Sequence, residues 1–331
     1  MLIPPKYFLT PEITQRLQSI EGSKEVINSL EIPGEIETMI RRKSTLKSSL
    51  FSARIEGNPL TLEELQKTPS SDQRKKEVFN ILRGLNWVYK RGSRDLSVKN
   101  ILDLHQVAMK DLIDQNALGK FRNETTAIFN ANGIAVYLPP PPRKIPSLIK
   151  RLLSFINSDK EPFVPIRACL AHYSFEKIHP FFDGNGRVGR LLLQAVLVKS
   201  GYAMKGLLAI EENLDQKRPK YYRALDEPEK DVSAYLEFML AIIDQAAREA
   251  KKEVIKKQQG TAEDYLLPRR AEILSIIRDH EFANFDLIRR RFLAVNERTL
   301  RYDLKKLSDL GLIKKLGKTR GVYYRAAKSA S

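Results

Sequence analysis

The glycine-rich connection of this chain reads His179-Pro180-Phe181-Phe182-Asp183-Gly184-Asn185-Gly186-Arg187-Val188-Gly189-Arg190. It lies between two apolar segments, residues 164–178 and 191–197, that we expect to be helices. A glycine-rich turn at the start of a helix binds anions, because unpaired backbone N–H groups and the helix dipole both favour negative charge. The segment therefore predicts a phosphate-binding loop between two apolar helices.

The side chains around this loop indicate phosphoryl or nucleotidyl transfer. His179 belongs to the residue type that titrates near neutral pH, so it can accept the proton of an attacking hydroxyl. Asp183 offers a hard oxygen ligand for Mg²⁺. Arg187 and Arg190 lie on the same side of the second helix and can bind phosphate oxygens. The chain lacks the sequence GxxxxGK followed by Ser or Thr, which excludes a P-loop.

A β-hairpin is expected between the helical regions. The β-prone runs 125–129 and 134–138 flank the turn Asn130-Ala131-Asn132-Gly133. Two such runs around an Asn-Gly turn are typical of a hairpin. The four prolines at 139–142 then end the second strand and hold an extended exit.

The loop matches the Fic-family motif HPFx(D/E)GNGRxxR at every defined position, and the chain resembles this family over about residues 40–245. The hairpin resembles the family's target-positioning flap. The segment 221–225, Tyr-Tyr-Arg-Ala-Leu, resembles the family's YYxxL stretch near the adenine pocket, although the Asn expected after it falls near Glu229 here. The resemblance implies a mainly α Fic fold, a helical bundle with a β-hairpin flap.

The same resemblance implies a protein adenylyltransferase, which transfers AMP from ATP to a Ser, Thr or Tyr hydroxyl of a target protein or of the chain itself. His179 would be the catalytic base and Asp183 the Mg²⁺ ligand. Gly184, Asn185 and Gly186 would hold the α-phosphate, and Arg187 and Arg190 the β- and γ-phosphates. The nucleotide-binding residues implied in this way are Thr126, Ala127, Ile128, Phe129, Asp183, Gly184, Asn185, Gly186, Arg187, Val188, Gly189, Arg190 and Tyr221.

The segment Ser52-Ala53-Arg54-Ile55-Glu56-Gly57 is similar to the inhibitory motif (S/T)xxxE(G/N) of many Fic proteins. Its place before the catalytic motif resembles the class with an N-terminal inhibitory helix. A Glu56 carboxylate can pair bidentately with Arg190, which would leave bound ATP misaligned for attack. We therefore expect Ser52, Glu56 and Gly57 to form an autoinhibitory element. The alternative is an ordinary helix end with a surface Glu and a glycine C-cap.

The pattern changes after the polar segment 251–265, which we expect to be a helix end followed by a linker. Helices are expected at 270–280, at 285–292 and after the N-cap Asn296, followed by a hairpin over 312–325. This order predicts an α+β winged helix-turn-helix domain over residues 266–331, which hold 16 Lys or Arg and 7 Asp or Glu.

We expect DNA as a partner of this basic domain, with the third helix in a major groove and the hairpin on phosphates. The residues expected at this interface are Arg298, Thr299, Arg301, Tyr302, Lys305, Lys318 and Arg320. The alternative is a winged helix used for protein contacts or dimerisation, with a basic face that is only solvated.

Length and composition limit the number of domains and the class of partner that we expect. The chain has 331 residues and a formal charge of +17, which suits two or three domains and a polyanionic partner. We expect an N-terminal helical region at 1–95 with the inhibitory helix at about 40–58, and a Fic catalytic domain at 96–250. The lone Cys169 cannot form an intramolecular disulfide, and no signal peptide or membrane span is evident, so we expect a cytoplasmic protein. A homodimer through either domain is compatible with the sequence.

Two other readings remain open. The first is a related enzyme that uses another nucleotide, transfers phosphate or removes AMP from a modified target. Doc-type relatives, which transfer phosphate, carry Lys where this chain has Gly186, so Gly186 weighs against a kinase. The second is a DNA-binding regulator whose core senses ATP. His179 weighs against that reading, because binding alone needs no base. His105 and His172 are expected to be packed in the helices, and no zinc site is expected.

Overall fold

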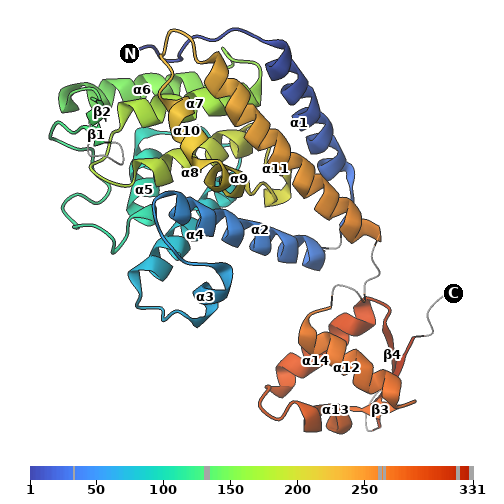
Figure 1. Ribbon diagram of the computed structural model, residues 1–331. Coiled ribbons are helices and arrows are strands. Elements are labelled where there is room, and N and C mark those ends of the chain that lie inside the picture. Colours follow the sequence, from blue (N-terminus) through green and yellow to red (C-terminus); the bar gives the residue numbers. More distant parts are fainter. Residues whose placement is uncertain (33, 130–134, 260–262, 264–265, 318–320, 328–331) are drawn as a thin grey trace. The chain divides into compact units, whose positions relative to one another are not determined.

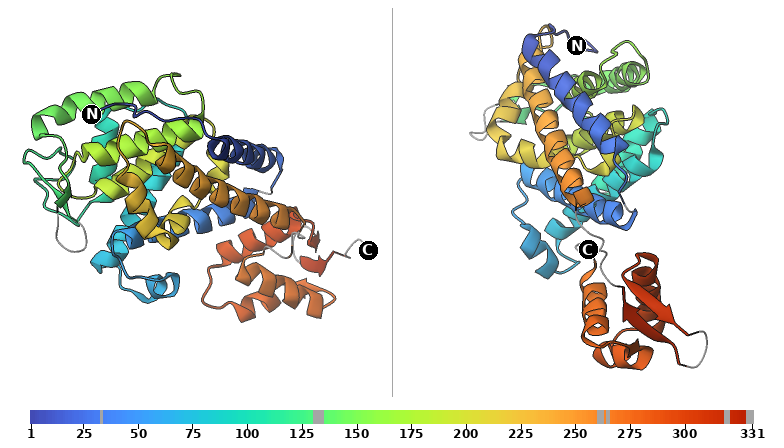
Figure 2. Two further views of the ribbon diagram at one scale, coloured as in Figure 1. Left: turned by 45° about the horizontal axis from the view of Figure 1, so that its top comes forward. Right: turned by 90° about the vertical axis from the view of Figure 1, so that its right-hand side faces the viewer.

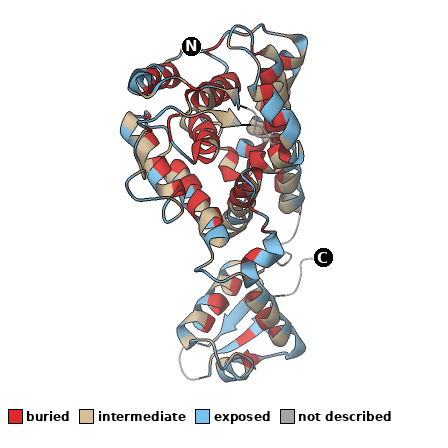
Figure 3. Ribbon diagram, turned by 60° about the vertical axis from the view of Figure 1, so that its left-hand side comes forward, coloured by how far each residue is buried: buried red, intermediate tan, exposed pale blue. Residues whose placement is uncertain are grey.

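Two helices at the centre of the larger part of the molecule carry the glycine-rich loop between them. They are α7 (Val164–Ile178) and α8 (Asn185–Lys199). Most residues of both helices are buried, including polar ones such as His172 and Arg190, and Figure 3 shows that buried residues concentrate in the interior of this part. Helix α8 packs against α7 and against α4 (Gln73–Arg91) and α5 (Val98–Ala108) (Figure 1). The loop is therefore anchored at both ends in a closely packed core.

The computed structural model describes residues 1–32, 34–129, 135–259, 263, 266–317 and 321–327. These fall into two units, residues 1–254 and 255–331. The remaining elements of the first unit are α1 (Pro11–Ser29), α2 (Gly34–Ile55), α3 (Leu62–Lys67), β1 (Ile128–Phe129), β2 (Ala135–Tyr137), the 3₁₀ turn η1 (Pro142–Lys144), α6 (Ile145–Ile156), the 3₁₀ turn η2 (Met204–Gly206), α9 (Ile210–Gln216), α10 (Arg218–Leu225) and α11 (Ser233–Gln259).

The N-terminal helices close the larger unit on two sides. Helix α1 lies beside α11 (Figures 1 and 2), where Arg16 and Ser19 both contact the buried Asp244. Helix α2 packs against α4 and α9. Two residues beyond its last residue, Ile55, Gly57 has φ 101°, a backbone conformation that favours glycine and ends the helix.

The flap strands β1 and β2 pair antiparallel, with Ile128 opposite Tyr137 and Phe129 opposite Ala135. The predicted mainly α fold with a β-hairpin is thereby confirmed. The predicted turn at 130–133 lies outside the described residues. Helix α11 continues to Gln259, within the segment 251–265 where we expected a helix end and a linker. Ala250 and Val254 are buried, so the apolar face of the helix extends beyond residue 250.

The second unit contains three helices and a small sheet. Helices α12 (Pro268–Asp279), α13 (Phe285–Arg291) and α14 (Glu297–Asp309) are accompanied by strands β3 (Ala283–Asn284), β4 (Ile313–Leu316) and β5 (Tyr323–Ala326), as Figure 2 shows. The strand order is β3-β5-β4, and both pairings are antiparallel. The Asn296 side chain caps α14 by accepting from the N–H of Arg298, at 2.8 Å.

A buried cluster from all three helices and the sheet forms the core of this unit. The sequence did not predict β3, which is only two residues long and adds an edge to the expected hairpin. Among the helices of the described residues, none combines the length and apolar character needed to cross a membrane.

Candidate active site

The loop between α7 and α8 is fixed by its own residues. His179 caps α7 in the left-handed conformation, with φ 49° and ψ 59°, and its N–H donates to the Phe175 carbonyl at 3.0 Å. Asn185 clamps the loop from the other end. Its Oδ1 accepts from the Phe181 N–H at 2.9 Å, and its Nδ2 donates to the Phe181 carbonyl at 2.8 Å. The Asn185 side chain is thus structural. The Gly184 N–H donates to the Asp183 Oδ1 at 2.5 Å, and the first turn of α8 that follows is the kind of helix start that binds anions.

His179 faces a cavity and is neutral at pH 7. Burial lowers the pKa of the imidazole to about 4, although the Glu176 carbonyl, which accepts a hydrogen bond from the ring, partly opposes this. The Arg122 Nε donates to the His179 carbonyl at 2.8 Å and holds the residue in place. A neutral, oriented imidazole beside an anion-binding loop can accept a proton.

Asp183 and Arg187 form a charged pair at the rim. The Arg187 Nη2 lies 2.9 Å from the Asp183 Oδ1, and its Nη1 lies 2.8 Å from the Glu77 Oε1. The Asp183 side chain is 52% exposed, so its carboxylate remains open to a cation. No group of three or more His, Cys, Asp or Glu in the described residues forms a complete metal site. A single open carboxylate fits Mg²⁺ that takes its other ligands from phosphates and water.

Arg190 is 1% exposed and is bound by the end of α2. Its Nη2 donates to the Glu56 Oε1 at 2.8 Å and to the Ser52 carbonyl at 2.9 Å, and its Nε donates to the Ser52 hydroxyl at 2.9 Å. The expected bidentate pairing with Glu56 is therefore replaced by one contact to Glu56 and two to Ser52. Burial raises the pKa of Glu56, but Arg190, Arg187 and Arg218 outweigh it, so the pKa lies below its usual value.

The glycine at position 186 makes this contact possible. A Cβ atom there would overlap the Glu56 carboxylate and approach the Arg190 guanidinium. Gly186 therefore lets the α2 carboxylate lie directly over the first turn of α8, where an anion would bind.

A cavity of about 770 Å³ extends from this point toward the flap. Of the residues implicated by the sequence, it is lined by Glu56, Ile128, His179, Gly186, Arg190 and Tyr221. Pro219, Tyr222 and Leu225 form its more apolar end. Thr126 and Ala127 are half-buried nearby in the chain, and the Phe129 side chain lies outside the described residues.

Several residues expected to bind nucleotide do not line the cavity, namely Thr126, Ala127, Asp183, Gly184, Asn185, Arg187, Val188 and Gly189. Val188 is fully buried in the core, because it lies on the opposite face of α8 from Gly186 and Arg190. Gly189 is covered by the Glu176 side chain. Tyr221 lines the cavity but is only 1% exposed, and its hydroxyl contacts the His172 Nε2 at 2.8 Å. Tyr222 is 42% exposed and donates to the Ile55 carbonyl at 3.2 Å.

Comparison with known proteins places this loop in a family. Residues 95–197 match the model of the Fic/DOC family. This part of the chain is a Fic domain. The chain is also 27% identical over 238 residues to proteins named "Protein adenylyltransferase Fic" from Drosophila yakuba and Drosophila melanogaster, covering 68% of this chain and 46% of each relative. The chain thus spans about half the length of these curated relatives.

Solved structures show the same fold. A Fic family protein from Desulfovibrio desulfuricans G20 superposes with a TM-score of 0.68 at 24% identity, covering 99% of both chains. Fic-1 from C. elegans superposes with a TM-score of 0.58 at 22% identity, covering 74% of this chain and 72% of that one. The predicted Fic fold is confirmed by these similarities.

Three residues that hold the Fic loop were not predicted in this role from the sequence. His105 accepts from the Gly119 N–H at its Nδ1, so its Nε2 carries the proton that it shares with the Asp183 carbonyl at 3.1 Å. It also stacks on Phe181, at 3.8 Å between ring centroids. His105 was expected only to pack in the core. Arg122 and Glu77 were not predicted at all, because no motif connects them to residues about 60 to 110 positions later in the chain.

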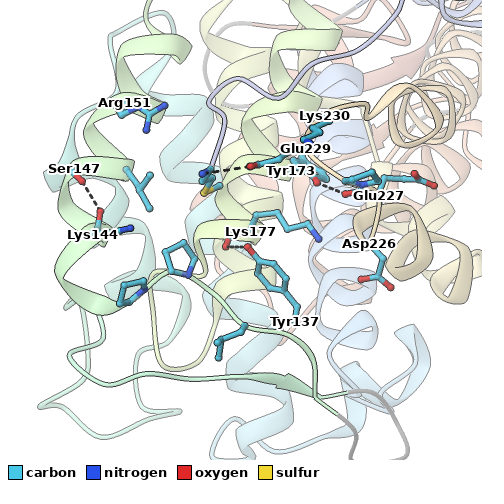
Figure 4. A pocket seen from close by; sticks show the side chains of 16 residues that line it. Tyr137, Lys144, Ser147, Arg151, Tyr173, Lys177, Asp226, Glu227, Glu229 and Lys230 are labelled. Carbon is cyan, nitrogen blue, oxygen red and sulfur yellow. Dashed lines mark hydrogen bonds and ion pairs between the residues drawn. The ribbon is translucent and has the colours of Figure 1, made fainter.

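A second cavity, of about 980 Å³, is shown in Figure 4. Tyr137, Lys177 and Asp226 line both cavities. Figure 4 shows α6 side chains on one side of this space, and the 226–230 segment on the other. The two cavities therefore adjoin at these three shared residues, one of which, Tyr137, lies on strand β2 of the flap.

In the second unit, the residues proposed for DNA lie on α14. Arg298, Arg301, Tyr302 and Lys305 are exposed and Thr299 is half-buried, while Leu300, Leu304 and Leu307 face the core. Lys318 and Arg320 lie outside the described residues. The buried Asp303 accepts from Arg269 and Arg270, which fixes α14 against α12.

Proposed function

We propose that this chain is a protein adenylyltransferase that is inhibited by its own Glu56. The observation that supports it most is a neutral His179 beside an anion-binding loop, in a cavity that ends in a more apolar region able to take a nucleobase. The names of the Drosophila relatives agree with AMP transfer. The substrate would be ATP and the product a protein with AMP on a Ser, Thr or Tyr hydroxyl.

In the proposed reaction, His179 takes the proton of the target hydroxyl. The hydroxyl oxygen forms a bond to the α-phosphorus of ATP, the bond to the bridging oxygen breaks, and pyrophosphate leaves. The backbone N–H groups of 184–186 would stabilise charge on the α-phosphate. Mg²⁺ bound at Asp183 would neutralise charge on the phosphates, and Arg187 would add to this.

Inhibition would follow from competition for Arg190. This guanidinium is the group expected to bind the γ-phosphate, and Ser52 and Glu56 occupy it through three hydrogen bonds. A nucleotide could enter the cavity with its phosphates out of line for attack. The cavity of Figure 4 would accept the target segment, which strand β2 could register by strand pairing.

The test uses ATP labelled on the α- or the γ-phosphate, with Mg²⁺, in a cell lysate. Wild type, Glu56→Gly and the double variant with His179→Ala are compared. Protein labelled only from α-labelled ATP, more strongly in Glu56→Gly and not at all with His179→Ala, is the expected result. Label from the γ-phosphate would indicate phosphate transfer, and release of AMP from a pre-modified target would indicate the reverse reaction. A lack of label in every variant, with ATP still bound, would favour an ATP-sensing regulator.

A second function is supported by the other unit. The exposed face of α14 carries Arg298, Arg301, Tyr302 and Lys305, and residues 266–331 have a net charge of +9. We propose that this unit is a winged helix that binds DNA. Protein contacts or dimerisation through the same unit would be the alternative outcome.

A further inference from the structure

One wall of the Fic cavity holds a carboxyl group that the proposed reaction does not use. Glu176 lies one helical turn before His179 on α7 and lines the same cavity. Its Oε1 is buried without a hydrogen-bond partner among the described residues, and 12% of the side chain remains exposed. That oxygen lies against the backbone of α8 at Gly189, so a molecule in the cavity would meet the part of the Glu176 side chain that remains exposed.

A second polar pair lies directly behind it. His172 is fully buried, and its Nε2 contacts the Tyr221 hydroxyl at 2.8 Å. Its Nδ1 lies 3.8 Å from the Glu176 Oε1 and also has no hydrogen-bond partner in the described part of the chain. Both side chains lie over the backbone of Gly189, where a Cβ would overlap the Glu176 carboxyl and approach the His172 Nδ1 to 3.2 Å. The absence of a side chain at Gly189 therefore leaves room for this polar group.

The position of Glu176 lies between the two ends of the cavity. It lies against Gly189, which precedes Arg190 on the phosphate side, and 3.8 Å from His172, which contacts Tyr221 on the side of the apolar end. In a nucleotide, the ribose joins the α-phosphate to the base. We propose that Glu176, supported by the His172–Tyr221 pair, forms a polar subsite that hydrogen-bonds a ribose hydroxyl of the bound nucleotide. This inference rests on the proposed nucleotide site.

The charge of the carboxyl is compatible with a polyphosphate ligand. Burial raises the pKa of Glu176 to about 8; Arg190 opposes this and Glu56 adds to it. Phosphates in the cavity favour the neutral form further. A neutral carboxyl can both donate to and accept from a hydroxyl, and it does not repel the phosphates.

The experiment measures nucleotide affinity by calorimetry in a Glu56→Gly, His179→Ala background protein. Glu56→Gly removes the inhibitory carboxylate, and His179→Ala prevents turnover. Mg–ATP is compared with 2′-deoxy-ATP, 3′-deoxy-ATP and GTP. Glu176→Leu and Glu176→Gln are added separately, with Glu63→Gln on the exposed α3 as the control. We expect Glu176→Leu to weaken ATP binding about 3- to 10-fold, the range of one neutral hydrogen bond. We expect Glu176→Gln, which keeps donor and acceptor, to restore most of it.

The deciding result is whether the effect of removing a ribose hydroxyl on affinity depends on the presence of Glu176. One of the two deoxy nucleotides should bind more weakly than ATP to the background protein, but as tightly as ATP to the Glu176→Leu protein. If the background protein binds ATP and both deoxy nucleotides equally tightly, no ribose hydroxyl contributes to binding. That result alone would overturn the ribose assignment, before any Glu176 variant is measured. Coupling to GTP instead would assign Glu176 to the base and likewise overturn it. A background protein that binds no ATP would refute the proposed function itself. Glu176→Ala replaces Glu176→Leu if the latter does not fold.

Discussion

Gly189 shows how a single residue determines what its neighbours can do. Because it lacks a side chain, Glu176 and His172 can both lie against the backbone of α8. A larger residue would push the Glu176 carboxyl toward the cavity or force the helices α7 and α8 apart. The residue that allows the polar subsite is therefore one that never touches the cavity itself.

We expect Gly189→Ala to destabilise the protein by about 1–3 kcal/mol, the usual cost of adding a methyl group to a packed core. The cost should fall in a Glu176→Ala protein, because the overlapping carboxyl is then gone. Urea unfolding of wild type, both single variants and the double variant measures this coupling. Gly22→Ala in α1, where a Cβ meets no atom within 4 Å, is the control and should stabilise by up to about 1 kcal/mol. Strictly additive costs would contradict the role assigned to Gly189.

At the scale of the elements, α2 reaches the Fic loop from a separate part of the sequence. Beyond its contacts to Arg190, it is tied to α9 by a buried hydrogen bond from Ser48 to Glu211 and by ion pairs of Lys47 with Glu212 and of Arg54 with Asp215. The end of α2 is thus bound to α9 and to α8, and both Ser52 and Glu56 hydrogen-bond Arg190.

Because Ser52 and Glu56 both bind Arg190, removing one of these contacts should relieve the inhibition only in part. Ser52→Ala removes the hydroxyl that accepts from the Arg190 Nε but leaves the Ser52 carbonyl and Glu56 in place. We expect it to raise the rate of AMP labelling above wild type and by less than Glu56→Gly does. Initial rates with α-labelled ATP give the comparison, with Ser29→Ala at the exposed end of α1 as the control. A Ser52→Ala rate equal to wild type would mean that Glu56 alone holds Arg190.

The extent to which this site could be predicted depends on how local each contact is. The loop from His179 to Arg190 and the strands of the flap are encoded within short segments, so their patterns were readable. His105 and Arg122 act through backbone groups of residues distant in the sequence, and such contacts leave no local pattern. The single contact of Glu56 with Arg190, in place of a bidentate one, depends on how α2 approaches α8. That approach is set by packing against α4 and α9.

At the scale of the whole molecule, charge is distributed unevenly. Residues 266–331 carry a net +9 out of +17 for the chain. A basic unit that binds phosphates releases counterions, so its affinity for DNA should fall steeply with salt. An interface built on exposed apolar side chains would respond to salt much less.

We expect the full chain to bind duplex DNA, with affinity falling as salt rises. Arg298→Ala and Lys305→Ala should each reduce the slope of log affinity against log salt by about 1 if each contacts a phosphate. Fluorescence anisotropy with a labelled duplex measures the slope, and Lys150→Ala on the exposed side of α6 is the control. Binding that is absent at low salt, or unchanged by both α14 variants, would exclude this surface as the DNA interface.

The contacts of Arg190 also bear on how such a protein can change over evolutionary time. Since the same guanidinium restrains activity and is satisfied as a buried charge by Ser52 and Glu56, any substitution that loosens the restraint leaves an arginine poorly paired in the interior. A lineage that gains constitutive activity in this way loses part of its thermal robustness in the same step. Homologues that have lost the inhibition should therefore carry replacements around position 190 that restore stability. Organisms that grow at high temperature would be expected to retain the inhibited form.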